Sequence, residues 1–198
     1  MSARFATRLL LTAIGWSCLT GIAAAAPPTV TGSQWSQLDQ GQILVTVGPD
    51  WHGVRLYEVM GLLDAPVERT WRMLLDIDHY TTVFSAVSQS YVKQRLTPTH
   101  LHHYEALRLP WPLVSRWFVN DVNLHPESHS YDWTNLTGNV KEQRGAFYCF
   151  PRGNRTLLVY QLYFDPDAPW FPKFLLNIGQ RITLPSVIKD TRRAVARY

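Results

Sequence analysis

Short blocks of hydrophobic residues, separated by turn-forming residues, make up most of this chain. Blocks rich in Val, Leu, Tyr and Phe span 54–63, 87–95, 101–109, 115–124, 130–136, 142–150 and 155–164, and 43–47 is a possible further short strand. Runs of this composition bounded by Gly, Pro, Asn and Ser predict β-strands. From residue 87 to 164 the blocks recur roughly every 10–14 residues with short turns between them, which favours an antiparallel meander.

Two short helices are predicted between residues 64 and 82. Asp64 can cap the first helix, Pro66 suits its first turn, and Glu68 favours the N-terminal end of the helix dipole. Val67, Trp71, Leu74 and Leu75 share one helical face, and residues 76–82 form a turn and a second short helix.

A long amphipathic helix is predicted at the C-terminal end of the chain, over residues 171–195. Its apolar positions recur near helical spacing, and Pro185 lies in the middle of the segment. Proline removes a backbone donor and clashes with the preceding turn, so this helix is expected to bend.

These elements predict an α+β fold. A curved antiparallel sheet of about seven strands would wrap around the long C-terminal helix, with two short helices after the first strand. The block 155–164 is apolar on both faces, so each face should pack against something. A sheet that curls around a helix can leave a hollow between the two.

The first 25 residues have the pattern of a secretory signal peptide. Arg4 and Arg8 precede an apolar stretch, and the Ala cluster 23–26 supplies small residues for cleavage, best placed after Ala25. A retained membrane anchor and a lipid-modified Cys18 are the alternatives, but the apolar run is short for a span and Trp16 is bulky for a lipidation site. Residues 26–41 follow as a flexible lead-in, and 42–198 form the domain, exported to the periplasm or secreted.

Composition excludes several classes of protein. The chain is 46% hydrophobic and 17% charged, which is typical of a globular domain. Two of the 19 basic residues lie in the leader, so the mature chain has 17 basic and 15 acidic residues. Because this charge is nearly balanced, a nucleic-acid partner is not expected. Cys149 is then the single cysteine of the mature chain, and it is expected to be buried.

Three stretches resemble the START-like, or helix-grip, superfamily, which includes polyketide cyclases and coenzyme Q-binding START-type proteins. They are LLDAPVERTWRMLLDIDHYTTVFSAV (62–87), LPWPLVSRWFVNDV (109–122) and FPKFLLNIGQ (171–180), the last with a Pro-x-x-Leu-x-Asn helix opening. Where many relatives have Arg-Asp in the second stretch, this chain has Arg116-Trp117. The resemblance implies a chamber for a hydrophobic molecule.

The chamber predicts a set of ligand contacts on the strands and the last helix. Arg116 and Arg144 either point inward, as an anchor for a polar ligand end, or face solvent. The predicted contacts are Tyr104, Arg116, Phe118, Trp133, Arg144, Tyr148, Tyr160, Phe174, Ile178 and Ile182.

Two further features have a functional and a structural interpretation. His100 and His102 share a strand face at a spacing that can bind zinc, but without an obvious third ligand we expect surface histidines and no metal. Trp111 and Trp170 lie in proline-containing loops, which are either rigid aromatic turns or a rim that contacts a membrane.

The predicted function is an exported carrier that acts as a monomer and binds a hydrophobic small molecule or lipid without a cofactor. An aromatase/cyclase-type enzyme, with Tyr104, Arg116 or Tyr148 as acid or base, is the alternative, and we expect no catalytic residues. A protein-interaction module with a solid interior is the third interpretation.

Overall fold

The computed structural model describes residues 29–198. Its strands are β1 (Leu44–Trp51), β2 (Val54–Leu63), β3 (Val87–Thr97), β4 (His100–Leu107), β5 (Arg116–His125), β6 (Ser130–Gly138), β7 (Glu142–Arg152) and β8 (Arg155–Asp165). Its α-helices are α1 (Gly32–Asp39), α2 (Val67–Leu75), α3 (Tyr80–Val83), α4 (Lys173–Thr183) and α5 (Pro185–Val195). Two single-turn 3₁₀ helices, η1 (Ile77–His79) and η2 (Pro126–Ser128), complete the described elements.

The eight strands form one antiparallel sheet in the order β1-β2-β8-β7-β6-β5-β4-β3. Strands β3 to β8 are the predicted meander, and β2 pairs with β8 so that the first hairpin joins the last strand. The predicted α+β fold is confirmed. The sheet has eight strands because the short block at 43–47 continues to Trp51 as β1, and the short helices therefore follow the second strand.

A helix, α1, lies within the segment that the sequence predicted to be a flexible lead-in. The Thr31 side chain and Gln34 form a reciprocal capping box that starts this helix. Leu38 is buried among Met60, Leu157 and other apolar residues on the outer face of the sheet. Because α1 covers that face, the strand β8 is apolar on both sides, as the sequence indicated.

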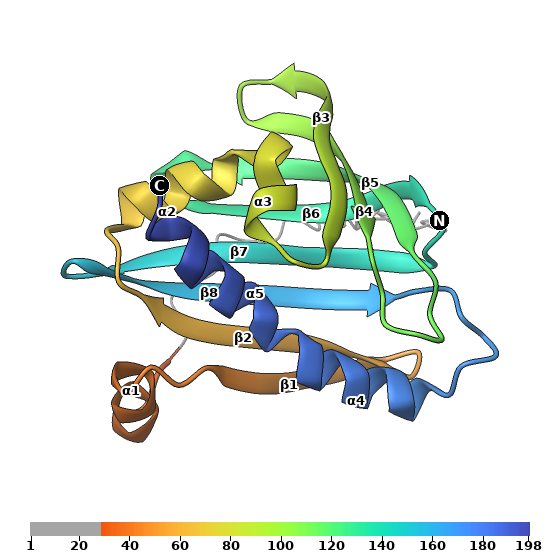
Figure 1. The fold of residues 1–198 in the computed structure, drawn as a ribbon, viewed down its shortest axis with the longest axis horizontal. Helices are drawn as coiled ribbons and strands as arrows, with labels where there is room; N and C mark the ends of the chain where they lie inside the picture. The colour runs from red at the N-terminus through yellow and green to blue at the C-terminus, as the bar shows by residue number, and fades with distance from the viewer. Residues whose placement is uncertain (1–28) are drawn as a thin grey trace, which may run out of the picture.

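The long C-terminal segment crosses the other face of the sheet as two helices. α4 ends at Thr183 and α5 begins at Pro185, with Leu184 between them. Pro185 suits the first turn of α5 because it lacks the backbone donor that a helix start leaves unpaired. Figure 1 shows the two helices, in blue, running diagonally in front of the strands with a change of direction at their junction.

Asn177, Arg192 and Ile188 attach this helix pair to β2 and to the turn before it. In α4, the Asn177 side chain accepts a hydrogen bond from the Arg55 backbone at 3.3 Å and donates one to the Gly53 carbonyl at 3.2 Å. In α5, Arg192 donates to the Leu62 carbonyl at 2.9 Å. Between them Ile188 is fully buried against Gly61. The Asn of the helix-opening motif therefore fixes α4 to the β1–β2 hairpin.

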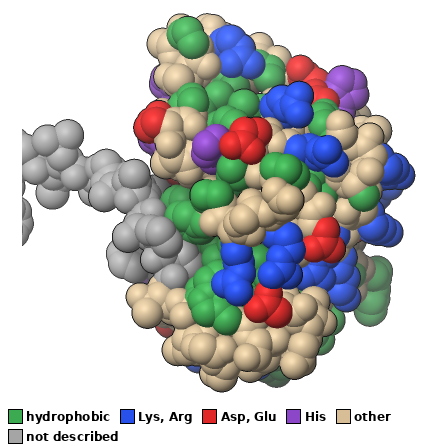
Figure 2. Space-filling view, turned by 90° about the vertical axis from the view of Figure 1, so that its left-hand side faces the viewer, with side chains coloured by type: hydrophobic (Ala, Val, Ile, Leu, Met, Phe, Trp, Pro, Cys, Tyr) green, Lys and Arg blue, Asp and Glu red, His purple; other side chains and the backbone are tan. Residues whose placement is uncertain are grey.

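The surface charge is mixed. Figure 2 shows basic and acidic side chains interspersed on the end of the molecule that carries α2 and the C-terminus. Between residues 29 and 198, every helix is too short or too polar to cross a bilayer.

The approach of α5 to β2 requires glycine at position 61. A Cβ atom added there would lie 2.5 Å from Ile188 Cγ2, well inside van der Waals contact. We expect Gly61→Ala to lower the free energy of unfolding by about 1–3 kcal/mol, measured by urea denaturation. Gly32→Ala, where an added Cβ meets nothing within 4 Å, should change it by less than about 0.5 kcal/mol. An Ile188→Ala background should reduce the effect of Gly61→Ala, and strictly additive losses would contradict this account.

Candidate functional site

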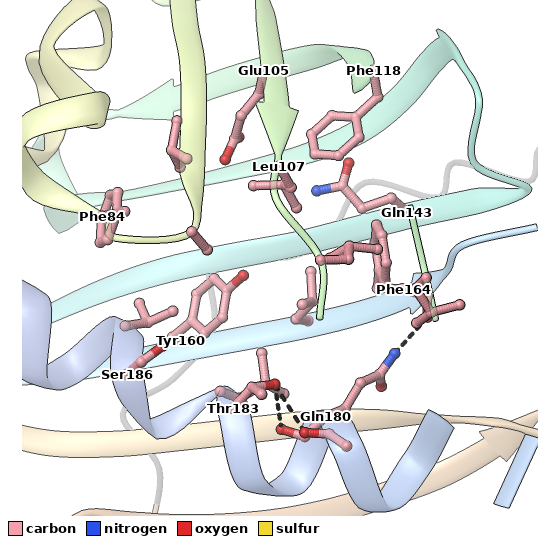
Figure 3. Close-up of a pocket in the computed structure, with 18 of the residues that line it drawn as sticks. Phe84, Glu105, Leu107, Phe118, Gln143, Tyr160, Phe164, Gln180, Thr183 and Ser186 are labelled. Carbon is pink, nitrogen blue, oxygen red and sulfur yellow. Dashed lines mark hydrogen bonds between the residues drawn. The ribbon is translucent and has the colours of Figure 1, made fainter. Parts of the chain in front are cut away.

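A cavity of about 390 Å³ lies between the inner face of the sheet and the helix pair. Its walls come from residues 80–87 in α3 and the start of β3, from strands β4 to β8, from residues 109–113 in the β4–β5 loop, and from α4 and the start of α5. Most of the side chains that line it are apolar or aromatic, and Figure 3 shows them projecting inward from the strands above and the helices below. A cavity of this size and character is typical of a site for a small hydrophobic molecule.

One wall of the cavity is a group of packed aromatic rings. Phe147 lies between Tyr160, at 4.6 Å between ring centroids, and Trp133, at 5.7 Å. Trp133 is opposite Gly145 on β7, and a Cβ atom on Gly145 would collide with the Trp133 ring. Glycine at this position therefore lets the indole lie flat against the sheet.

A pair of buried tyrosines closes the wall on the side of α3. The Tyr80 hydroxyl donates to the Leu74 carbonyl at 2.5 Å and lies 2.6 Å from the Tyr131 hydroxyl. Burial raises the pKa of both phenols, so both keep their protons at neutral pH. Because Tyr80 donates to Leu74, Tyr131 must donate to Tyr80, and both donors are used within the protein.

Glu105 and His103 place ionisable groups in the hollow. The Ser90 hydroxyl donates to the Ile77 carbonyl at 2.6 Å, so it accepts from His103 Nε2 at 2.8 Å. Burial lowers the pKa of His103 to about 4, and the imidazole is neutral. Burial raises the pKa of Glu105 to about 7, and its carboxyl lies 3.9 Å from His103 Nδ1. The site can therefore hold or release one proton near neutral pH.

Three of the predicted ligand contacts lie on the cavity wall and three lie on the opposite face of the sheet. Phe118, Trp133 and Tyr160 line the cavity. On the outer face, Tyr104 stacks on Tyr91, Arg144 lies over the Tyr163 ring, and Tyr148 stacks on Phe150. The outer face carries aromatic residues of its own, so residue type alone does not separate the two sides.

Arg116 is buried but does not line the cavity. Its guanidinium donates to the Pro166 carbonyl at 2.6 Å and to the Val114 carbonyl at 3.2 Å. These bonds join the start of β5 to the loop that follows β8, so Arg116 positions the two loops beside the cavity.

The remaining predicted contacts, Phe174, Ile178 and Ile182, lie on the exposed side of α4. The side that lines the cavity carries Leu175, Leu176, Gly179, Gln180 and Thr183. Both sides of this helix are partly apolar, so periodicity alone did not fix which one faces the sheet. Whether any of the ten predicted residues contacts a ligand stays a prediction.

Several polar residues of the cavity were not among the predicted contacts, and they include Glu105, Asn120, Gln143 and Gln180. Each is in phase with apolar residues that face inward. Glu105 and Asn120, for example, lie two positions before Leu107 and Val122, which also line the cavity. A polar residue at an inward position of a strand is the signal that could have identified them.

His100 and His102 meet a third possible metal ligand in the folded chain. Asp121 lies directly opposite His102 on β5, and its carboxylate is 2.5 Å from His100 Nε2 and 3.5 Å from His102 Nε2. His100, His102 and Asp121 together have the ligand types of a zinc site on the outer face of the sheet. Its close His100–Asp121 contact is also an ordinary hydrogen-bonded pair.

Comparison with known proteins identifies the class of fold. No protein-family model and no curated protein matches the chain. Among solved structures, the Zhui aromatase/cyclase from Streptomyces sp. R1128 superposes with a TM-score of 0.63 at 14% identity, over 79% of this chain and 95% of that one. A START superfamily protein from Mycobacterium smegmatis gives 0.60 at 17% identity, over 72% and 97%.

A STAR-related lipid transfer protein (fragment 25–204) from Xanthomonas axonopodis gives a TM-score of 0.60 at 17% identity, over 77% of this chain and 98% of that one. The resemblance read from the three sequence stretches is confirmed at the level of the fold. This chain has the helix-grip fold of START-like proteins, and its cavity lies between the sheet and the C-terminal helices.

The raised pKa of Glu105 predicts a pH-dependent stability. Between pH 4.5 and pH 7 the folded protein keeps this proton and the unfolded chain loses it, so ionisation of the carboxyl in the unfolded chain increasingly favours unfolding as the pH rises. We expect Glu105→Gln to gain stability over the wild type across this range, by at most about 3 kcal/mol above pH 7. His103 titrates in both proteins and cancels in the difference. A difference in unfolding free energy that stays constant from pH 4.5 to pH 8 would contradict the assignment.

Proposed function

We propose that this protein binds one hydrophobic small molecule or lipid in the cavity beneath α4 and α5. The observation that carries the proposal is an apolar cavity of about 390 Å³ where a solid interior would leave almost none. A volume of this size argues against the interaction-module interpretation. Burial of apolar ligand surface would supply the affinity, and the lipid-transfer protein among the structural neighbours supports this use of the fold.

We further propose that the protein works outside the cytoplasm as a carrier or buffer. The leader of residues 1–25 motivates this part, and it lies outside the described residues. In the periplasm or in the extracellular medium, a monomer that encloses an apolar molecule would move it through water without a cofactor.

A membrane is the proposed source or destination of the cargo. Along α4 an apolar stripe of Phe174, Ile178 and Ile182 faces outward, and Ile182 is 73% exposed. Trp111, which lies at the cavity, is 92% exposed, and Trp170 is exposed just before α4. Trp prefers the membrane interface, and the exposed Arg181 on α4 is suited to anionic headgroups. This surface borders the residues that line the cavity.

The aromatase/cyclase-type enzyme remains the second candidate because of one observation. Glu105 is a buried carboxyl inside the cavity with a pKa of about 7, which suits a general acid or base. The acid–base candidates read from the sequence do not line the cavity, so Glu105 would take that role in their place.

The ligand site can be tested with two neighbouring substitutions on α4. Gly179 lines the cavity and has open space at its Cβ position, so Gly179→Trp should fill the hollow. Ile178→Trp adds the same ring on the exposed side of the helix. With N-phenyl-1-naphthylamine as fluorescent probe, we expect at least tenfold weaker binding for Gly179→Trp and a change below twofold for Ile178→Trp. Native mass spectrometry of the purified wild type should show a bound lipid that Gly179→Trp lacks. Equal probe binding by both variants would defeat the proposal.

Membrane contact can be tested independently of the cavity. We expect the double variant Phe174→Ser/Ile182→Ser to bind vesicles of phosphatidylglycerol and phosphatidylethanolamine at least fivefold more weakly in flotation assays, because apolar insertion is lost. Leu136→Ser removes an apolar side chain of comparable exposure on β6 and serves as the control. Vesicle binding that is the same for all three proteins would exclude α4 as the contact surface.

A further inference from the structure

The cavity contains buried polar atoms that have no hydrogen-bond partner. They are Asn120 Oδ1, Gln143 Oε1, Gln180 Oε1 and Trp133 Nε1. All four side chains belong to residues that line the cavity and are more than nine-tenths buried, Asn120 being only 2% exposed. Buried polar groups in folded proteins are almost always paired, so four such atoms around one hollow indicate that a partner enters it.

The arrangement of these atoms is fixed by the fold. Gln180 donates its Nε2 to the Phe164 carbonyl at 2.7 Å, which turns its carbonyl oxygen away from that bond. Gln143 lies opposite Phe164 on the neighbouring strand, and Asn120 lies opposite His103. Figure 3 shows Glu105, Gln143 and Gln180 projecting into the site from β4, β7 and α4. The polar atoms therefore surround the hollow from several elements.

Three of the four unpaired atoms are hydrogen-bond acceptors, and the Trp133 indole nitrogen is a donor. A group that pairs with these atoms must donate hydrogen bonds to the three amide oxygens. It can accept bonds from the indole and from other donors of the wall, namely the amide nitrogens of Asn120 and Gln143 and the Tyr160 hydroxyl. A hydroxyl group does both, whereas a carboxylate or phosphate diester oxygen only accepts.

The charges around the hollow point the same way. Among the described residues, no Lys or Arg lines the cavity, and its ionisable side chains are Tyr80, His103, Glu105, Tyr131 and Tyr160. The imidazole of His103 donates to Ser90 and the two tyrosines Tyr80 and Tyr131 use their protons within the protein. An anionic group would thus find no cation among the described residues of the wall, and it would face the Glu105 carboxyl.

We propose that the ligand is an amphiphile with an apolar body and an uncharged, hydrogen-bond-donating end such as a hydroxyl, and that the cavity discriminates against carboxylates and phosphates. The apolar body would lie against the aromatic wall of Trp133, Phe147 and Tyr160, and the hydroxyl would reach the amide oxygens of Asn120, Gln143 and Gln180. This inference rests on the proposed function.

The test compares 1-dodecanol with dodecanoate at pH 8 as competitors of N-phenyl-1-naphthylamine. We expect dodecanol to displace the probe from the wild type at a concentration at least tenfold lower. Because the alcohol and the carboxylate also differ in hydration free energy, the preference of the wild type alone does not identify the site, and the variants are compared with it. Gln143→Met and, independently, Asn120→Leu should each reduce the preference for the alcohol at least fivefold, while Gln161→Met, which changes an amide on the outer side of β8, should keep it. Glu105→Gln should strengthen dodecanoate binding at least fivefold.

Each outcome bears on a different claim. If the probe binds but dodecanoate competes as well as dodecanol, or if neither cavity variant changes the preference, the ligand assignment is overturned and the apolar carrier remains. If the probe and both competitors fail to bind the wild type, the proposed function fails, and the assignment fails with it. Circular dichroism of each variant confirms that the comparison is made on folded protein.

Discussion

The attachment of the C-terminal helix pair to β2 is the constraint on which the cavity depends. Asn177 fixes one end of the pair to the β1–β2 hairpin, Arg192 fixes the other to the Leu62 carbonyl, and Ile188 lies against Gly61 between them. The helices approach the sheet closely at this edge. Toward β4 and β5 the curved sheet departs from them, and the space between is filled only in part by side chains. The hollow follows from contact on one side and separation on the other.

The same geometry explains why polar atoms can stay unpaired inside an apolar site. A side chain that points into a filled core must find a partner from the protein, whereas one that borders a cavity can be satisfied by whatever occupies it. Pairing of Asn120, Gln143 and Gln180 with the proposed ligand would therefore favour the occupied site over the empty one. The raised pKa of Glu105 has the same origin, because burial away from cations disfavours its charged form.

The apolar stripe on the outer side of α4 connects binding to access. Most amphipathic helices turn their most apolar side to the core, but here Phe174, Ile178 and Ile182 face outward while Gly179, Gln180 and Thr183 face the cavity. An exposed stripe of this kind is costly in water and is common where a surface contacts a lipid or another protein. Its position on the helix that closes the cavity suits a molecule that collects or delivers its cargo at an interface.

The sequence alone predicted the strands closely, because runs of β-branched and aromatic residues between turn signals report local structure. The strand blocks differ from β2 to β8 by no more than a few residues at either end, and Pro185 marked the junction of the final helices. The burial of Cys149 was also predicted and is confirmed.

The side toward which each residue points was decided only by the tertiary structure. Alternation separates Tyr104 from Glu105 and Arg144 from Gln143, but it does not say which set lies inside when both faces of the sheet are covered, one by α1 and the other by α5. The helix α1 itself depends on Leu38 finding an apolar surface on β2 and β8. Local propensity therefore determined which segments form strands and helices. Which side chains lie in the interior was determined by the packing of distant segments, because burial is a property of the assembled layers and not of any one segment.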